Sequence, residues 1–361
     1  MVPFSVLVAP GTIARRPALS SRIMRVGVFS GKSYDRDHLA RANRELGSPH
    51  ELVFLDARLT GETAELAAPF PAICVFVNDH VDAGVLARIA AGGSQGGATG
   101  LVALRCAGFN NVDLPAARRL GVTVARVPAY SPHAVAEHTL GLILMLIRKL
   151  HRATNRVREG NFSLEGLLGF EIHEHTVGVI GTGQIGQTVV RLLSGFGARL
   201  LAADPTPSPE CIELGATYVP LPDLLAESDV LTLHCPLSAA TRHIIDSAAL
   251  ARMKRGAILV NTGRGALVDA AALVGALKDG RLGGLALDVY EEEERLFFED
   301  HSGDVLQDDV FARLLTFPNV VITGHQAFFT EEALQAISHT TLSNISDFEQ
   351  GRPLAAPARV A

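Results

Sequence analysis

The 361-residue sequence contains no tryptophan and only four cysteines. The cysteines are Cys74, Cys106, Cys211 and Cys235, and none of them shows the C-x-x-C spacing typical of zinc sites. The sequence therefore predicts neither a zinc site nor a disulfide framework, and we expect no metal. Because free thiols are typical of reducing compartments, we expect a cytoplasmic location.

A strong excess of one charge is also lacking. The chain has 32 basic and 38 acidic residues, which gives a formal net charge of −6. Proteins that bind nucleic acid or anionic membranes usually concentrate positive charge, and this composition does not. We therefore expect neither nucleic acid nor a membrane as a partner.

Long hydrophobic runs are missing as well. The longest apolar helix candidate is uncharged only over residues 139–147, whereas a membrane span needs roughly 20 apolar residues. We expect no segment to cross a bilayer. With 48% hydrophobic and 19% charged residues the composition is that of a globular protein, and the length allows two domains.

Residues 1–23 differ from the rest of the chain. They contain no acidic residue, and their basic residues follow the first apolar stretch, whereas a secretory signal has the opposite order. A transit peptide is one interpretation. We prefer an N-terminal extension or an upstream start site, because Met24 directly precedes a plausible first strand.

A dinucleotide-binding pattern lies in the middle of the chain. The apolar run 176–180 leads into a glycine motif of Gly181, Gly183 and Gly186, and a second apolar run ends at Asp204. The first glycine permits a tight turn, the second lets the backbone approach a pyrophosphate, and the third lets helix and strand pack closely. A carboxylate at Asp204 would bind both ribose hydroxyls and repel a 2′-phosphate, which favours NAD over NADP.

Strands alternate with helices along most of the chain, which indicates α/β folding with parallel sheets covered by helices on both faces. Ser131 and Pro132 predict the start of a long apolar helix that ends near Ile147. A smaller α/β unit precedes this helix, and a final helix is expected over 330–348. The expected strands are 26–29, 52–55, 73–77, 101–104 and 122–125 in the first unit, and 176–180, 200–203, 230–234, 258–261, 284–287 and 320–323 in the second.

Polar residues follow the later strands, and ligands of open parallel sheets bind at such carboxyl ends. Arg264 would bind a substrate carboxylate through a forked pair of hydrogen bonds and polarise a ketone. His325 could act as general acid or base, because an imidazole titrates near neutrality. A carboxylate of the acidic run 291–294 would orient this ring, but the spacing does not choose among the four.

From Met24 onward the chain resembles the NAD-dependent D-2-hydroxyacid dehydrogenases. The resemblance rests on the motifs at residues 29–35, 104–113, 127–132, 136–138, 161–166, 181–186, 233–237, 261–267, 287–291 and 324–328. It implies two doubly wound, Rossmann-like domains, in which the NAD-binding domain (129–327) is inserted into a smaller flavodoxin-like substrate domain (24–128 and 328–361). The N-terminal extension has no counterpart in the family.

The resemblance also implies roles for individual residues. The catalytic set falls on Arg264, Glu293 and His325, and the substrate contacts fall on Ala107, Gly108, Tyr130 and Phe328. The NAD contacts fall on Gly181, Gly183, Gln184, Ile185, Gly186, Asp204, Cys235, Pro236, Thr241, Thr262, Gly263 and Asp288. Gly263 departs from relatives that often carry serine or alanine there.

The implied reaction is NADH-dependent reduction of pyruvate to D-lactate, with His325 as the acid. Glyoxylate, hydroxypyruvate or phenylpyruvate are alternative substrates, because pocket size does not follow from sequence. We also expect a homodimer or homotetramer. In a different class, the chain could be an NAD-sensing corepressor or scaffold, since a fold alone does not fix a function.

Overall fold

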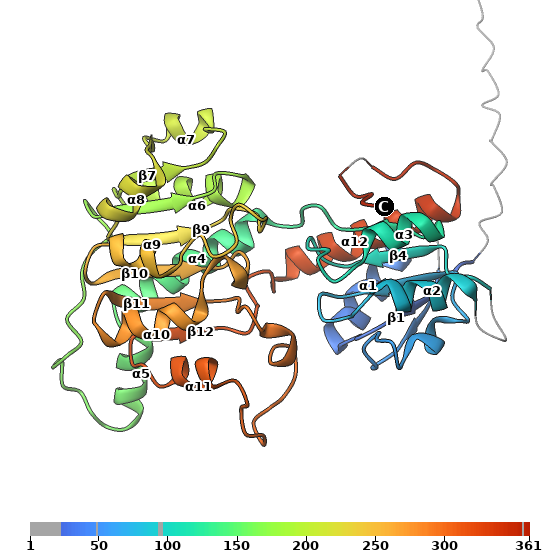
Figure 1. Cartoon of the computed structure of the whole chain (residues 1–361), viewed down its shortest axis with the longest axis horizontal. Coiled ribbons are helices and arrows are strands. Elements are labelled where there is room, and N and C mark those ends of the chain that lie inside the picture. Colours follow the sequence, from blue (N-terminus) through green and yellow to red (C-terminus); the bar gives the residue numbers. More distant parts are fainter. Residues whose placement is uncertain (1–22, 48–49, 93–96, 356) are drawn as a thin grey trace, which may run out of the picture. The chain divides into compact units, whose positions relative to one another are not determined.

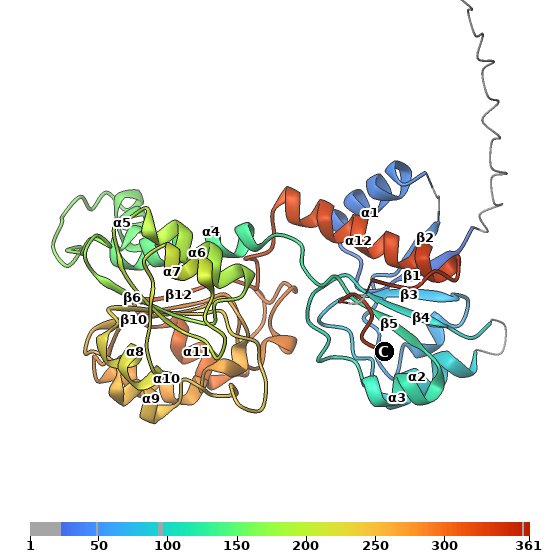
Figure 2. The same ribbon diagram turned by 90° about the horizontal axis from the view of Figure 1, so that it is seen from above.

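The computed structural model describes residues 23–47, 50–92, 97–355 and 357–361. The chain forms two compact units, which we describe separately. Unit 1 contains the chain up to Pro128 together with Ser338–Ala361, and unit 2 is Ala129–Ile337. Residues 1–22 of the expected N-terminal extension lie outside the described residues. Helices cover both faces of the sheet in each unit (Figure 2).

Unit 1 is built on a parallel sheet whose strand order is β2-β1-β3-β4-β5. This order is the flavodoxin-like order, which places a topological switch point between β1 and β3. Helices α1 and α12 cover one face and α2 and α3 cover the other (Figure 2). The strands are β1 (Arg25–Val28), β2 (Glu51–Phe54), β3 (Ala72–Val75), β4 (Leu101–Leu104) and β5 (Thr123–Ala125), and the helices are α1 (Ser33–Glu45), η1 (Ala64–Ala67), α2 (Ala83–Ala91) and α3 (Leu114–Leu120). Helix α12 (Glu331–Glu349) begins in unit 2 and belongs to unit 1 from Ser338 onward.

Unit 2 contains a larger parallel sheet with the order β12-β11-β10-β9-β6-β7-β8. Its strands are β6 (Thr176–Ile180), β7 (Arg199–Ala203), β8 (Thr217–Tyr218), β9 (Val230–Leu233), β10 (Ala257–Asn261), β11 (Leu282–Leu287) and β12 (Val320–Ile322). The helices are α4 (Pro132–Ile147), α5 (Leu150–Arg158), α6 (Gln184–Ser194), α7 (Pro209–Glu213), α8 (Leu221–Glu227), α9 (Ser247–Arg252), η2 (Gly265–Leu267), α10 (Ala270–Lys278), η3 (Glu293–Arg295) and α11 (Asp309–Leu315).

Two apolar layers hold the unit 2 sheet. Helices α4 and α6 pack on one face through residues such as Ile143 and Leu193, both fully buried. Helices α8 to α11 pack on the other face through residues such as Leu224 and Leu314. Figures 1 and 2 show the sheet between these layers. Burial on both faces explains why these strands are apolar without alternation.

Local signals fixed the start of α4. The Ser131 hydroxyl accepts a hydrogen bond from Ala134 N at 3.2 Å, and Pro132 occupies the first turn. This is the predicted N-cap followed by proline, and it is confirmed. The apolar length of α4 reflects burial against the sheet. Among the described residues, no helix is long and apolar enough to span a membrane.

The predicted fold class is confirmed, and the expected strands recur with shifts of one or two residues at their ends. Strand β8 was missed, because two residues at a sheet edge leave no detectable periodicity. Helix α5 was also missed. It has no buried residue.

An ion pair ties β6 and β9 to the start of β10. Asp229 Oδ2 accepts a hydrogen bond from Thr176 N at 2.9 Å, and Asp229 Oδ1 lies 2.9 Å from Lys254 Nζ. Partial burial acts to raise the pKa of Asp229, but the Lys254 and Thr176 hydrogen bonds outweigh it and hold this pKa below its ordinary value of 3.8.

We therefore predict that Asp229→Asn destabilises unit 2 by about 1 kcal/mol at neutral pH. A carboxylate with a lowered folded pKa stabilises above its unfolded pKa, and this contribution is lost as the pH falls through the folded value. In thermal unfolding, the wild type should have a higher unfolding temperature than Asp229→Asn at pH 7, and this difference should disappear below pH 3.8. Asp223→Asn, an exposed change on α8, is the control. An advantage of equal size at both pH values would contradict the assignment.

Candidate active site

Three neighbouring strands bring the predicted chemistry to one sheet edge. Strands β10, β11 and β12 are adjacent and parallel, so their carboxyl ends lie side by side. Arg264 follows β10, Asp288 directly follows β11, and His325 follows β12. The edge therefore collects a guanidinium, a carboxylate and an imidazole from segments far apart in the sequence.

His325 contacts Glu293. Its Nδ1 lies 2.9 Å from Glu293 Oε1, and Glu293 Oε2 accepts a hydrogen bond from Tyr290 N at 2.9 Å. Both carboxylate oxygens of Glu293 are thus hydrogen-bonded, which fixes the orientation of the group that contacts the His325 ring. Glu291 instead pairs with Arg242 and His243. Spacing left the choice within the acidic run open, and the contact at Glu293 agrees with the position that the resemblance implied.

The backbone at His325 is constrained. His325 has a left-handed φ of 53°, a conformation that non-glycine residues rarely adopt. Its amide donates to the Asp288 carbonyl oxygen at 2.8 Å. The Asp288 carboxylate accepts hydrogen bonds from Gln326 N and Ala327 N, each at 2.9 Å. Strain of this kind persists only where the surrounding contacts over-determine it.

Two phenylalanine rings lie beside the imidazole of His325. Phe328 lies 6.4 Å from His325 between ring centroids, and Tyr130 lies 6.3 Å from Phe328. Phe298, which sequence reasoning missed, lies 5.7 Å from His325 and has a left-handed φ of 69°. The neighbouring Phe297 is buried in the core against Phe311. No periodic pattern in the sequence distinguishes the two phenylalanines.

Arg264 sits on a tightly packed loop. Asn261 Nδ2 donates to the Arg264 carbonyl oxygen at 2.8 Å, and Asn261 Oδ1 accepts from Gly263 N at 3.0 Å. One guanidinium nitrogen of Arg264 donates to the Gly263 carbonyl oxygen at 2.7 Å. A Cβ atom on Gly265 would lie 2.1 Å from the Tyr290 carbonyl carbon. The Arg264 loop therefore packs directly on the backbone segment whose amide binds Glu293.

The glycine motif has the geometry that dinucleotide binding needs. Gly181 has a φ of 90°, and a Cβ there would lie 2.4 Å from Cys235 N. A Cβ on Gly186 would lie 2.0 Å from the Gly181 carbonyl oxygen, whereas nothing lies within 4 Å of a Cβ on Gly183. Open space thus faces the first turn of α6, where Gln184 and Ile185 lie, and backbone amides there can bind a phosphate. These residues fit NAD.

Asp204 lies at the end of β7, beside the glycine loop. Its Oδ2 accepts from Thr182 N at 2.7 Å and its Oδ1 accepts from Thr206 N at 2.8 Å. Tyr218 Oη donates to Thr182 Oγ1 at 2.8 Å, so strand β8 also steadies the loop. Each carboxylate oxygen can accept a second hydrogen bond, which leaves capacity for ribose hydroxyls.

The remaining predicted NAD contacts lie at neighbouring strand ends of unit 2. Cys235 and Pro236 follow β9, and Thr241 Oγ1 donates to the Pro236 carbonyl oxygen at 2.6 Å. Burial raises the pKa of the Cys235 thiol to about 11, so it stays protonated. Thr262 Oγ1 lies 2.8 Å from Thr139 Oγ1 on α4.

Ala107 and Gly108 belong to unit 1 and follow β4. Arg126 Nη1 donates to the Ala107 carbonyl oxygen at 2.8 Å, and the preceding Arg105 is buried with its Nε 3.1 Å from Asp35 Oδ1. The sequence did not indicate that Arg105 and Arg126 stabilise the loop of Ala107 and Gly108. Their partners are distant in sequence, so only the fold reveals the contacts.

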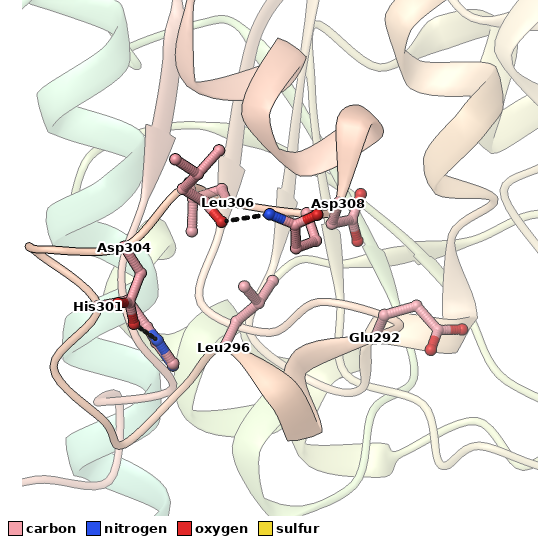
Figure 3. A pocket seen from close by; sticks show the side chains of 8 residues that line it. Glu292, Leu296, His301, Asp304, Leu306 and Asp308 are labelled. Atoms are coloured by element: carbon pink, nitrogen blue, oxygen red, sulfur yellow. Dashed lines mark hydrogen bonds and ion pairs between the residues drawn. The ribbon is translucent and has the colours of Figure 1, made fainter.

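A cavity of about 670 Å³ lies under the loop that follows η3 (Figure 3). Its lining combines the apolar side chains of Leu296, Val305 and Leu306 with the acidic residues Glu292, Asp304 and Asp308. His301 Nδ1 lies 2.9 Å from Asp304 Oδ2. Asp308 caps α11 and accepts a hydrogen bond from Tyr290 Oη, so this carboxylate has a structural role. In the part of the chain that is described, no three histidine, cysteine or acidic side chains are placed to hold a metal.

Comparison with known proteins identifies the family. Residues 140–327 match the NAD-binding domain of D-isomer-specific 2-hydroxyacid dehydrogenases. The chain is 52% identical over 328 residues to D-lactate dehydrogenase of Escherichia coli, which covers 91% of this chain and 98% of that protein. The apo structure of the E. coli enzyme superposes with a TM-score of 0.83 at 48% identity, covering 94% of this chain and all of that one. The pyruvate reductase of Chlamydomonas reinhardtii superposes with a TM-score of 0.86 at 44% identity, covering 93% and 99%. The chain therefore belongs to the NAD-dependent D-2-hydroxyacid dehydrogenases.

Proposed function

We propose that the chain reduces pyruvate to D-lactate with NADH. The observation that carries this proposal is the 2.9 Å contact between His325 Nδ1 and Glu293 Oε1. It lies at the sheet edge where the carboxyl ends of the strands meet, and Arg264 follows one of these strands, β10. The names of the E. coli and Chlamydomonas relatives support the choice of substrate. Glyoxylate, hydroxypyruvate and phenylpyruvate are the alternatives within the same class.

In this proposal His325 is the acid. Glu293, as a carboxylate, accepts a hydrogen bond from the N–H group at Nδ1 of His325. Nε2 is therefore the nitrogen that gives its proton to the substrate oxygen. Glu293 also stabilises the imidazolium before the transfer. Arg264 binds the substrate carboxylate and stabilises the charge that develops on the oxygen. NADH, when bound, supplies the hydride.

The side chains around His325 are proposed to form the pocket for the substrate methyl group. Tyr130 and Phe328 were expected there, and Phe298 joins them because its ring lies against the imidazole. Ala107 and Gly108 of unit 1 are proposed to donate backbone hydrogen bonds to the substrate carboxylate. Unit 1 would then be the substrate domain and unit 2 the NAD-binding domain.

For the cofactor, the first turn of α6 is proposed to bind the pyrophosphate through Gln184 and Ile185, and Asp204 to bind the ribose. Around the remainder of NAD we propose Cys235, Pro236, Thr241, Thr262, Gly263 and Asp288. Thr262 and Asp288 already bind protein groups, so their hydrogen bonds to NAD would add to these contacts.

The proposal includes a homo-oligomer. Phe162, Leu164 and Leu168 lie in one segment after α5 and are 75%, 83% and 88% exposed. Large apolar side chains exposed together are typical of protein interfaces. Their segment would be covered by a second copy in a dimer or tetramer. A cytoplasmic location is part of the same proposal and is supported by the four free cysteines.

We predict that His325→Ala lowers kcat/KM for pyruvate by roughly 10² to 10⁴-fold, because the general acid is lost. NADH affinity, measured by calorimetry, should change little. His301→Ala is the matched control, since His301 also pairs through Nδ1 with a carboxylate. Undiminished turnover in His325→Ala would refute the acid role. NADH binding without oxidation by any 2-keto acid in the wild type would favour the sensor or scaffold.

We predict that Phe298→Ala shifts the substrate preference toward phenylpyruvate. Removing this ring enlarges the space beside His325, and such changes typically alter discrimination by about 10- to 200-fold. The measurement is the ratio of kcat/KM for phenylpyruvate to that for pyruvate. Phe297→Leu, a change in the adjacent core residue, should leave the ratio unchanged. An unaltered ratio in Phe298→Ala would remove Phe298 from the pocket.

A further inference from the structure

The buried carboxylate of Asp288 organises the segment that carries His325. Asp288 has no exposed surface, and its Oδ1 accepts hydrogen bonds from Thr323 Oγ1 at 2.5 Å and Gln326 N at 2.9 Å. Its Oδ2 accepts from Ala327 N at 2.9 Å. Burial acts to raise the pKa of Asp288, but the hydrogen bonds from His138, Thr323 and Ala327 outweigh burial and hold this pKa below its ordinary value of 3.8, so the group is ionised. The bonds flank His325 on both sides in the sequence.

His138 on α4 completes this network. Its Nε2 lies 3.2 Å from Thr323 Oγ1 and 3.4 Å from Asp288 Oδ1. The Thr323 hydroxyl has one proton and donates it to Asp288, so it can only accept from His138. His138 Nε2 therefore carries a proton and donates it toward Thr323 and Asp288. This histidine belongs to the motif at residues 136–138, to which the proposed mechanism assigns no role.

The same helix turn also reaches the Arg264 segment. Thr139 Oγ1 donates to the Val135 carbonyl oxygen at 2.8 Å and lies 2.8 Å from Thr262 Oγ1. Its single proton goes to Val135, so the Thr262 hydroxyl donates to Thr139. Adjacent residues of α4 thus hold the segment after β12 and the segment after β10.

We infer that His138 is a positioning residue for the reaction, acting on His325 through Thr323 and Asp288. This inference rests on the proposed function of His325. His138 supplies a donor that orients the Thr323 hydroxyl toward the Asp288 carboxylate. The carboxylate then fixes the amides of Gln326 and Ala327, and the left-handed backbone of His325 follows. Small displacements of an acid are costly, because proton transfer needs hydrogen-bond geometry.

The first test compares two substitutions at His138. His138→Phe keeps a ring but removes the donor, and we expect kcat to fall roughly 10- to 100-fold. His138→Gln places an amide nitrogen near the position of Nε2 and should restore kcat to within about threefold of wild type. NADH affinity and KM for pyruvate should change less than about threefold in both. His133→Phe, on the exposed face of the same helix, should behave as wild type.

A double-mutant cycle tests the route. Thr323→Val removes the hydroxyl that links His138 to Asp288 and should lower kcat as much as His138→Phe does. If both act through one chain of hydrogen bonds, the double variant should lose no more than either single variant. Fold losses that multiply would overturn the inference. Unchanged kcat in His138→Phe, or equal loss in His138→Phe and His138→Gln, would do the same.

A spectroscopic readout is independent of turnover. In protein labelled with ¹⁵N-histidine, the hydrogen-bonded Nδ1 proton of His325 is assigned by its absence in His325→Ala. We expect this resonance in wild type and His138→Gln, and its broadening or loss in His138→Phe and Thr323→Val. An unaltered resonance in all variants overturns the inference. If wild type reduces no 2-keto acid while the resonance still responds to His138, the proposed function fails and the positioning contact stands.

Discussion

One buried charge, the Asp288 carboxylate, sets the arrangement of the candidate site. It lies at the end of β11, between the strands that precede Arg264 and His325, and its oxygens accept hydrogen bonds from the β12 segment. An ionised group without exposed surface is stable only where hydrogen bonds replace water. The segment after β12 must therefore close around it. That closure holds His325 in its left-handed conformation and brings its ring to Glu293.

The segments that carry Arg264 and His325 are connected through backbone packing as well as through side chains. Gly265 packs on the Tyr290 carbonyl, Tyr290 N binds Glu293, and Glu293 holds His325. Helix α4 adds a second connection through His138 and Thr139. These contacts connect the segments that carry Arg264 and His325 without any substrate. Stabilisation of a developing charge requires groups that are positioned in advance in this way.

Local sequence patterns predicted the glycine turn and most of the strands. Gly181 and Gly186 have steric reasons in the structure, a left-handed turn and close packing on the Gly181 carbonyl oxygen, which are the reasons that the spacing suggested. Buried parallel strands are apolar throughout, so they stand out in the sequence. Strand β8 escaped detection because two residues are too few to show a periodicity. Phe298 and His138 escaped because their partners are distant in the chain.

By itself, the sequence determined the doubly wound fold, the glycine turn in front of α6 and the residue types at the strand ends. These features depend on neighbours within a few residues, and local sterics and periodicity record them. The resemblance implied Glu293 as the partner of His325, and the tertiary structure supplied the contact that spacing left open. Only the tertiary structure decided that Asp288 binds the Thr323 hydroxyl. Those pairings depend on where strands far apart in sequence end in space, and no spacing along the chain encodes that distance.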